Sequence, residues 1–275
     1  MLLLLTNKAD VNKTGGLYHT ALQAAALRGH KRIGQLLLDH RAQVNIVGGW
    51  HGTALQAAIY GGHEEIALLL LQNKADVHKK GREGSALNAA AEWGYEWAVS
   101  LLFANNAKPD TQALNTASSN GHENIVKLIL EQGARVDSES LRLAAYRGYT
   151  RILQRLMDAG GTVNAETLNW AARNGQEEIV KFLLGKNVNV KASSKALLWA
   201  VRSRDEGTVR ALLQKGARVS GEALEEVAGY GPETIVRLLL DKEVKVTKRA
   251  LALANTRQDK ELFHLMERKA KNGKG

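Results

Sequence analysis

The chain has 275 residues, 44% of them hydrophobic, which is enough apolar side chain for a sizeable buried core. It contains no Cys, which excludes a disulfide framework and a thiolate metal site. The net charge is +10, and half of this excess lies in residues 248–275, which carry eight Lys and Arg against three Asp and Glu. The sequence has no secretory signal and no apolar run of roughly 18 residues, so we expect an intracellular protein, in the cytoplasm by default.

One leucine, followed by small residues, recurs along the whole chain at intervals of 27 to 33 residues. We call it the anchor leucine; its copies are Leu22, Leu55, Leu87, Leu114, Leu141, Leu168, Leu197, Leu224 and Leu251. A second motif, Ala-Asp-Val-Asn in residues 9–12, returns in variant form with the same step. A fixed period in this range predicts a stacked array of repeats.

Each repeat reads as two helices separated by a turn. The segment after the anchor is rich in Ala, which lets neighbouring helices approach closely, and the second segment, as in IVKLILE (residues 125–131), has apolar residues at helical spacing. A glycine such as Gly62 or Gly121 stands between them and allows the positive φ that ends a helix. Since no repeat alone can bury its apolar stripe, the repeats must stack.

These motifs resemble ankyrin repeats. The resemblance rests on Thr20-Ala21-Leu22-Gln23 and Thr53-Ala54-Leu55-Gln56, where the family usually has Thr-Pro-Leu-His, followed by Leu-rich helices and the Ala-Asp-Val-Asn motif. The Ala-Leu-Gln-Ala-Ala variant is similar to arrays in the C-terminal parts of large intracellular signalling proteins of filamentous fungi. The resemblance implies an all-α solenoid of helix-turn-helix units that binds partner proteins.

Taken in order, the chain begins within a repeat, because residues 2–12 match a second helix and its tail. We interpret this start as the remnant of a longer array, or as a frayed helix end. The predicted domains are a half repeat (1–12), three long repeats of about 33 residues (13–110), five short repeats of about 27 residues (111–247), a C-terminal capping unit (248–270) and a disordered basic tail (271–275).

The long repeats have room for a β-turn finger before each first helix, and Gly15-Gly16 and Gly48-Gly49 supply the conformations that such turns need. The short repeats lack this room. Four residues before their anchors stand helix N-cap types, which predict that the end of one repeat caps the next helix directly. These residues are Asp110, Asp137, Asn164, Ser193, Ser220 and Thr247.

A catalytic or metal site is not indicated. The sequence has no Cys nucleophile, no nucleophile elbow around a Ser and no P-loop. His30, His63 and His122 occupy the same turn position of different repeats, which favours turn packing over metal ligation, and Glu pairs such as Glu64-Glu65 open helices where the dipole favours them. We therefore predict a non-enzymatic protein with no cofactor and no metal.

Two further rows of side chains are assigned to structure. An amide follows each of several anchors, and an amide that both donates and accepts suits the backbone of the connecting loops. This row consists of Gln23, Gln56, Asn88, Asn115 and Asn169. Trp170 and Trp199 lie two residues after their anchors, where a stacked aromatic pair within the helix layer is favoured over a ligand site.

The candidate binding residues lie five and six positions after the anchor, just before the turn glycine. The resemblance implies that these positions line the concave face that ankyrin arrays use for partners, and they carry the Tyr, Trp and Arg types that dominate protein interfaces. The predicted partner-binding residues are Tyr60, Trp93, Tyr146, Arg147, Arg173, Arg202 and Tyr230, with Tyr146, Arg147 and Arg173 at the centre. An ordinary solvated helix end remains the alternative.

A second functional hypothesis uses the basic C-terminal unit to bind nucleic acid or an anionic membrane, with steep salt dependence. Its residues are Lys248, Arg249, Arg257, Lys260, Arg268, Lys269, Lys271 and Lys274. The rest of the chain is nearly balanced in charge and has no nucleic-acid-binding motif, so an unidentified protein partner is favoured and nucleic acid is disfavoured. A monomer is the default expectation.

Overall fold

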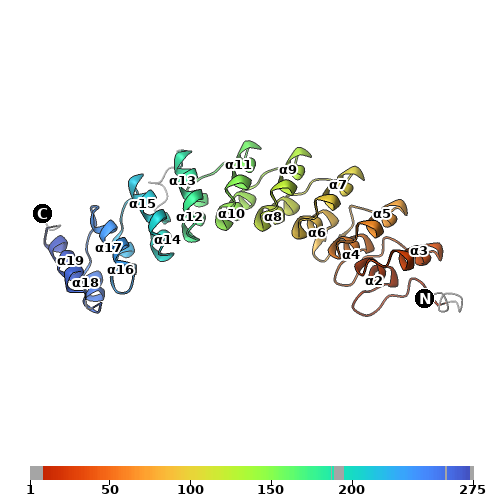
Figure 1. Cartoon of the computed structure of the whole chain (residues 1–275), viewed down its shortest axis with the longest axis horizontal. Helices are drawn as coiled ribbons and strands as arrows, with labels where there is room; N and C mark the ends of the chain where they lie inside the picture. Colours follow the sequence, from red (N-terminus) through yellow and green to blue (C-terminus); the bar gives the residue numbers. More distant parts are fainter. Residues whose placement is uncertain (1–8, 187, 189–194, 258, 273–275) are drawn as a thin grey trace. The chain divides into compact units, whose positions relative to one another are not determined.

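Helical hairpins make up almost all of the structure, because each repeat carries one alanine-rich segment and one amphipathic segment that can bury apolar surface only against a neighbour. The computed structural model describes residues 9–186, 188, 195–257 and 259–272 (Figure 1). Its packing divides into two compact units, Met1–Ser140 and Leu141–Gly275.

The described residues of unit 1 form four complete helical hairpins. Its helices are α2 (Ala21–Leu27), α3 (Lys31–Asp39), α4 (Ala54–Tyr60), α5 (Glu64–Gln72), α6 (Ala86–Trp93), α7 (Glu96–Ala104), α8 (Thr111–Asn120) and α9 (Glu123–Glu131). The first helices α2, α4, α6 and α8 pack on one another in sequence, and the second helices form a neighbouring row (Figure 1). The anchors Leu22, Leu55, Leu87 and Leu114 are at most 2% exposed, so they form the core between hairpins.

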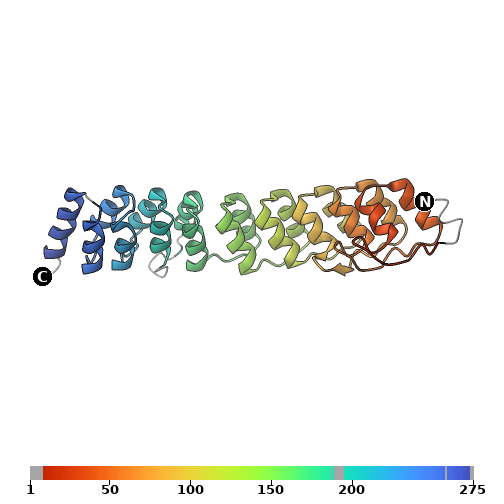
Figure 2. The same ribbon diagram turned by 90° about the horizontal axis from the view of Figure 1, so that it is seen from below.

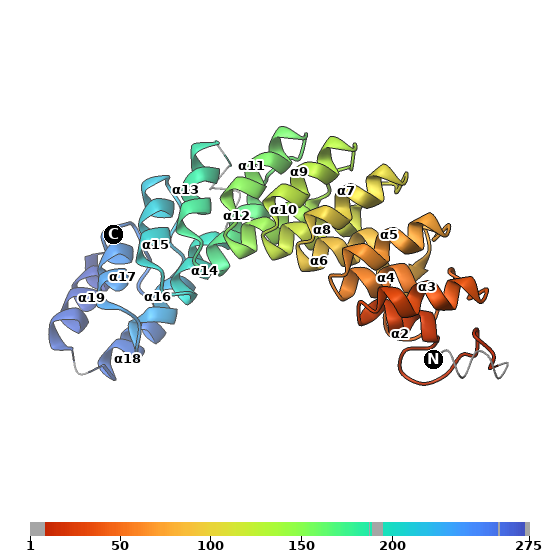
Figure 3. The same ribbon diagram turned by 45° about the vertical axis from the view of Figure 1, so that its right-hand side comes forward.

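Unit 2 repeats this arrangement with shorter connections. Its helices are α10 (Ser138–Arg147, which starts at the end of unit 1), α11 (Thr150–Asp158), α12 (Ala165–Arg173), α13 (Glu177–Gly185), α14 (Ala196–Arg202), α15 (Glu206–Gln214), α16 (Gly221–Ala228), α17 (Glu233–Leu240), α18 (Lys248–Asn255) and α19 (Lys260–Asn272). First helices α12, α14, α16 and α18 pack in sequence, as do second helices α13, α15, α17 and α19 (Figures 2 and 3). The all-α ankyrin-type architecture predicted from the sequence is confirmed.

The β-turn fingers precede the first helices of the long repeats, as predicted. In the first finger the Gly15 amide donates to the His19 carbonyl at 2.7 Å, and in the second Gly48 donates to Gly52 at 3.0 Å. In the third, β1 (Lys80–Gly81) pairs antiparallel with β2 (Gly84–Ser85). This pair is the one two-stranded sheet among the described residues.

Helix caps differ between the two kinds of repeat. In the short repeats Asp110, Asn164, Ser220 and Thr247 accept from backbone amides of the following helix, and Asp137 accepts from the Ser140 amide at 2.8 Å, as predicted. The predicted cap Ser193 lies outside the described residues, and α14 begins after Lys195, which makes no side-chain cap bond.

The long repeats are capped two residues before the anchor. Thr20 and Thr53 form capping boxes with Gln23 and Gln56, and Ser85 caps α6. A Thr followed three residues later by Gln is the sequence signature of this box. In the long repeats the last residue of the finger is therefore the N-cap, and it takes the role that a residue four positions before the anchor has in the short repeats.

The C-terminal helix is longer than predicted. Residues 271–275 were expected to be disordered, but α19 continues to Asn272, and the Lys271 Nζ lies 2.9 Å from Glu267 Oε1 one turn earlier. A cation in the last turn is also favoured by the helix dipole, which explains the extension. Residues 273–275 lie outside the described residues, as do residues 1–8, which make up most of the predicted half repeat.

The anchor leucines should dominate stability. Leu114→Ala removes a fully buried side chain and is expected to lower the free energy of unfolding by roughly 2–5 kcal/mol. Leu68→Ala is the matched control, since Leu68 is 39% exposed and its loss should cost about 1 kcal/mol or less. Urea unfolding followed by far-UV circular dichroism measures both, and equal losses would contradict the assignment of the core.

Candidate functional site

Three of the first helices, α2, α6 and α10, are each tied to the following repeat through one backbone carbonyl. The carbonyl five residues after the anchor lies near a ring nitrogen or accepts an amide hydrogen from the next repeat: His63 Nε2 lies 3.1 Å from Leu27 O, His122 Nε2 lies 3.2 Å from Glu92 O, and Asn174 Nδ2 donates to Tyr146 O at 2.8 Å. These contacts hold the backbone of the candidate positions in place. They also confirm that His63 and His122 pack against the turn.

In unit 1 the structure brings Tyr60 and Trp93 together. Their ring centroids are 6.3 Å apart in an edge-to-face arrangement, and the centroid of the His51 ring lies 4.8 Å from that of Tyr60. The Trp93 side chain is 52% exposed. Aromatic side chains held by such contacts present a large and rigid apolar surface to a partner.

Two carboxylates share the Tyr60 hydroxyl. This hydroxyl donates to Glu83 Oε2 at 2.5 Å, and Glu92 Oε2 lies 3.4 Å from the same oxygen. Burial, reinforced by the hydrogen bond to Glu83 and the charge of Glu92, raises the pKa of Tyr60 above its usual value, because ionisation would add a third negative charge here. Tyr60, at the end of α4, therefore contacts both Glu83 in the third finger and Glu92 in α6, the first helix of the next repeat.

The finger tips carry exposed apolar side chains that the sequence analysis did not assign. Leu17 is 60% exposed and Trp50 is 53% exposed; they line one hollow of about 350 Å³ with Arg82, whose guanidinium lies 5.3 Å from the Trp50 ring centroid. The available signal was positional, since Leu17 and Trp50 each directly follow a Gly-Gly pair at the tip of a turn. Large apolar side chains at such tips are exposed to water, and a group of them on the surface is a typical feature of an interface.

In unit 2 the predicted residues Arg173 and Arg202 belong to a ladder of alternating cations and aromatic rings. The guanidinium carbons of Arg142 and Arg173 lie 4.9 Å and 5.2 Å from the Trp170 ring centroid. Those of Arg173 and Arg202 lie 4.7 Å and 5.2 Å from the Trp199 centroid. We call these five residues the Arg–Trp ladder; each contact is a cation–π interaction, which orders otherwise flexible side chains.

The ladder corrects the interpretation of Trp170 and Trp199. A directly stacked aromatic pair was expected, but the Arg173 guanidinium lies over both rings. The physical reason is the stacking of the repeats. A residue two positions after one anchor leucine lies beside the residue five positions after the previous anchor, so Trp199 lies beside Arg173. The same relation places Tyr146 edge-to-face with Trp170 at 6.1 Å.

The ladder ends at a hollow of about 410 Å³. Arg202 donates from Nε and Nη2 to Glu226 Oε1 at 2.9 Å and 2.6 Å, and from Nη2 to Glu222 at 3.2 Å. Tyr230 lines the same hollow and is 79% exposed. Arg147, the remaining predicted residue, is exposed at the end of α10, and the structure does not place it against the other candidates.

The row of amides has the structural role predicted for it in unit 1. Gln23 Nε2 donates to Gly48 O at 3.1 Å and also bonds Gly52 O, Gln56 Nε2 donates to Gly84 O at 2.6 Å, and Asn88 Nδ2 donates to Glu83 O at 3.0 Å. Each amide thus holds the finger beside it. Asn115 differs, since it donates to the Asp137 side chain at 3.2 Å.

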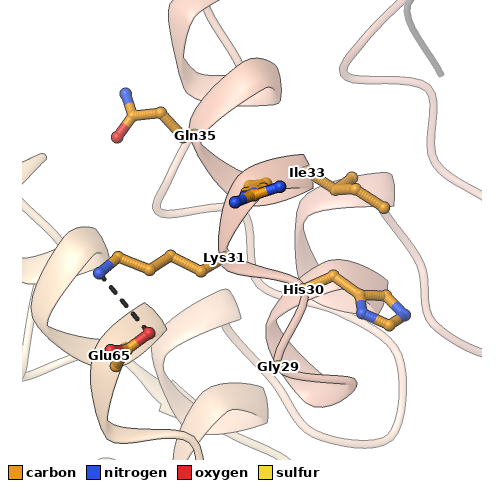
Figure 4. A pocket seen from close by; sticks show the side chains of 7 residues that line it. Gly29, His30, Lys31, Ile33, Gln35 and Glu65 are labelled. Carbon is orange, nitrogen blue, oxygen red and sulfur yellow. Dashed lines mark ion pairs between the residues drawn. The ribbon is translucent and has the colours of Figure 1, made fainter.

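A larger hollow, of about 650 Å³, lies at the start of α3 and contains none of the predicted residues (Figure 4). Lys31 projects across it to Glu65, with a 3.6 Å separation of Nζ and Oε2. Both side chains are more than half exposed, so this ion pair contributes little stability. The hollow is a shallow surface feature bordered mainly by one helix.

Within the residues that the structure describes, no three His, Asp or Glu side chains gather as a possible metal site. The same part of the chain contains no helix with both the length and the hydropathy of a membrane-crossing segment.

The family assignment follows from comparison with known families. A family model described as ankyrin repeats, in three copies, matches residues 1–81, 53–113, 74–140, 141–223 and 168–250. The chain belongs to the ankyrin-repeat family. No match was found among curated proteins. Ankyrin repeats are generally protein–protein interaction modules, and proteins built from them are typically non-catalytic scaffolds.

Because the pKa of Tyr60 is raised, we expect the stability of this ankyrin array to depend on Tyr60 at alkaline pH. Because the folded pKa exceeds the unfolded value of about 10, the stabilising contribution of Tyr60 is fully present below pH 10 and is lost as pH rises above it. Wild-type stability should therefore fall more steeply above about pH 10 than that of Tyr60→Phe. Urea midpoints at several pH values measure the difference, and parallel curves would contradict it.

Proposed function

We propose that the chain is a non-catalytic scaffold that binds a partner protein on the face formed by the ends of its first helices. The family resemblance equates this face with the concave face of ankyrin arrays. The observation that carries the proposal is the Arg–Trp ladder of unit 2. It places three Arg and two Trp side chains in mutual contact at positions where the repeat itself needs no such residues.

The physical argument concerns the residue types at the face and the free energy needed to order their side chains. Interfaces draw most of their affinity from a few Trp, Tyr and Arg side chains, and ordering a flexible side chain on binding costs free energy. A cation–π contact orders Arg173, hydrogen bonds order Arg202, and an edge-to-face contact with Trp170 orders Tyr146 in the free protein. In unit 1, Tyr60 and Trp93 offer a second preordered surface of different composition, with two carboxylates beside it.

The basic C-terminal unit is less suited to carry the function. Arg257 Nη1 donates to Gly231 O at 2.6 Å, Lys271 pairs with Glu267 at 2.9 Å, and Arg249 lies 3.8 Å from Glu225. Arg257 and Arg249 thus already contact the preceding repeat, and Lys271 contacts its own helix. Electrostatic binding of nucleic acid or anionic lipid therefore remains an alternative that the following experiment tests.

A triple variant, Tyr146→Ala, Arg147→Ala and Arg173→Ala, should lose the partner while its melting temperature changes little. The measurement is a pull-down from nuclease-treated lysate, read by mass spectrometry and compared with wild type. The control is Arg210→Ala with Arg237→Ala, which removes the same number of Arg charges from exposed sites on α15 and α17.

A discrete protein captured by wild type and by the control, but not by the triple variant, supports the proposal. Equal capture by all three proteins would contradict it. If capture requires nucleic acid, untreated lysate alone will yield nucleic-acid-associated proteins, and a steep loss with salt will support the basic unit instead.

A further inference from the structure

The rungs of the Arg–Trp ladder are not equivalent in their hydrogen bonds. Trp170 and Trp199 contact Arg173, with ring centroids 5.2 Å and 4.7 Å from its guanidinium carbon. A guanidinium hydrogen-bonds through N–H groups in its own plane, so a ring over its face fixes its orientation and leaves this edge available. Among the described residues, no hydrogen bond or ion pair of Arg173 occupies that edge.

Arg202, the next Arg of the ladder, shows which groups bind to such an N–H edge. Arg202 lies over the Trp199 ring at 5.2 Å, and its Nε and Nη2 donate to one oxygen of Glu226, with Glu222 at 3.2 Å from Nη2. An Arg ordered by this indole therefore binds carboxylates from the following repeat. Charge-assisted bonds of this kind are the strong ones.

The following repeat supplies no such carboxylate to Arg173. Glu222 and Glu226 stand two residues before and two residues after the anchor Leu224. The residues in those places around Leu197 are Lys195 and Trp199, one a cation and the other an aromatic ring. Compared with Arg202, Arg173 thus has the same guanidinium beside an indole, but both acidic residues of the following repeat are replaced. One of the replacements, Lys195, adds a positive charge.

We propose that Arg173, flanked by Trp170 and Trp199, binds a Glu or Asp side chain of an acidic segment in the partner protein. This inference rests on the proposed scaffold function and names the chemistry of the partner. The partner carboxylate accepts from the N–H edge of Arg173, as Glu226 does from Arg202. The two indoles hold the guanidinium through cation–π contacts, so less side-chain freedom is lost when the bond to the partner forms.

The test uses labelled peptides of alternating glycine and glutamate, with matched glycine–glutamine and glycine–phosphoserine peptides, at low ionic strength. Fluorescence polarisation should show that wild type binds the glutamate peptide about tenfold more tightly than the glutamine peptide, the size expected for one charge-assisted bond. The Arg173 Nε–Hε resonance should shift as the glutamate peptide is added to wild type.

Arg173→Lys keeps the charge but has no planar fork, so it should weaken binding of the glutamate peptide by about tenfold. Arg210→Lys is the matched control on α15, where Arg210 pairs with Glu206 at 2.7 Å, and it should bind as wild type does. Equal binding by wild type and Arg173→Lys, or no preference for glutamate over glutamine, would overturn the proposal. Binding of the phosphoserine peptide alone would also overturn it and assign the edge to phosphate.

The failure of this inference is distinguishable from failure of the scaffold proposal. If Arg173→Lys binds the glutamate peptide as wild type does while the triple Ala variant still loses its captured protein, the carboxylate assignment falls and the scaffold stands. If the triple variant retains every captured protein, the scaffold proposal falls.

Discussion

Close stacking of alanine-lined first helices is the constraint on which the rest of each unit depends. Ala57 and Ala58 in unit 1, and Ala171 and Ala172 in unit 2, are fully buried between hairpins. Small side chains at a helix contact set a short distance between axes, so successive first helices lie in close register. At the ends of α2, α6 and α10 that register puts one carbonyl within reach of a His, Asn or Gln of the next repeat. A larger residue at these Ala positions would separate the helices and remove the carbonyl contacts as well.

The candidate surface is a consequence of this register. The residue five positions after one anchor meets the residue two positions after the next anchor, which gives the contacts Tyr146–Trp170, Arg173–Trp199 and Arg202–Glu226 in three consecutive repeats. In these three repeats neither position is fully buried, so both can change chemistry while the anchor leucine stays. One scaffold thereby presents an aromatic–cation ladder in unit 2 and an aromatic–carboxylate cluster in unit 1.

Electrostatics distinguishes the side chains that hold the fold from those available to a partner. The cation of Arg202 is matched by Glu222 and Glu226, which also raise its pKa chiefly through the hydrogen bond to Glu226. Arg257 donates into the backbone of the preceding repeat. A formal charge of +10 is therefore a poor guide to function, because several of the cations in the C-terminal unit are used internally. Arg173 is informative because two indoles contact its guanidinium, while no hydrogen bond or ion pair of its N–H groups is found among the described residues.

The sequence by itself determined the repeat, the helical hairpins, the fingers and most caps of the short repeats. These are local properties: anchor spacing, apolar periodicity, turn glycines and N-cap residues each act within one repeat. It also singled out Tyr60, Trp93, Tyr146, Arg147, Arg173, Arg202 and Tyr230 as partner-binding residues, which stays a prediction. Only the tertiary structure decided which side chains meet. Trp170 and Trp199 read as a packing pair because both follow an anchor by two residues, and nothing local shows that an Arg from the previous repeat lies over each ring. Contacts between repeats join residues about 25 to 30 apart in sequence, and they depend on a stacking register that no single repeat encodes.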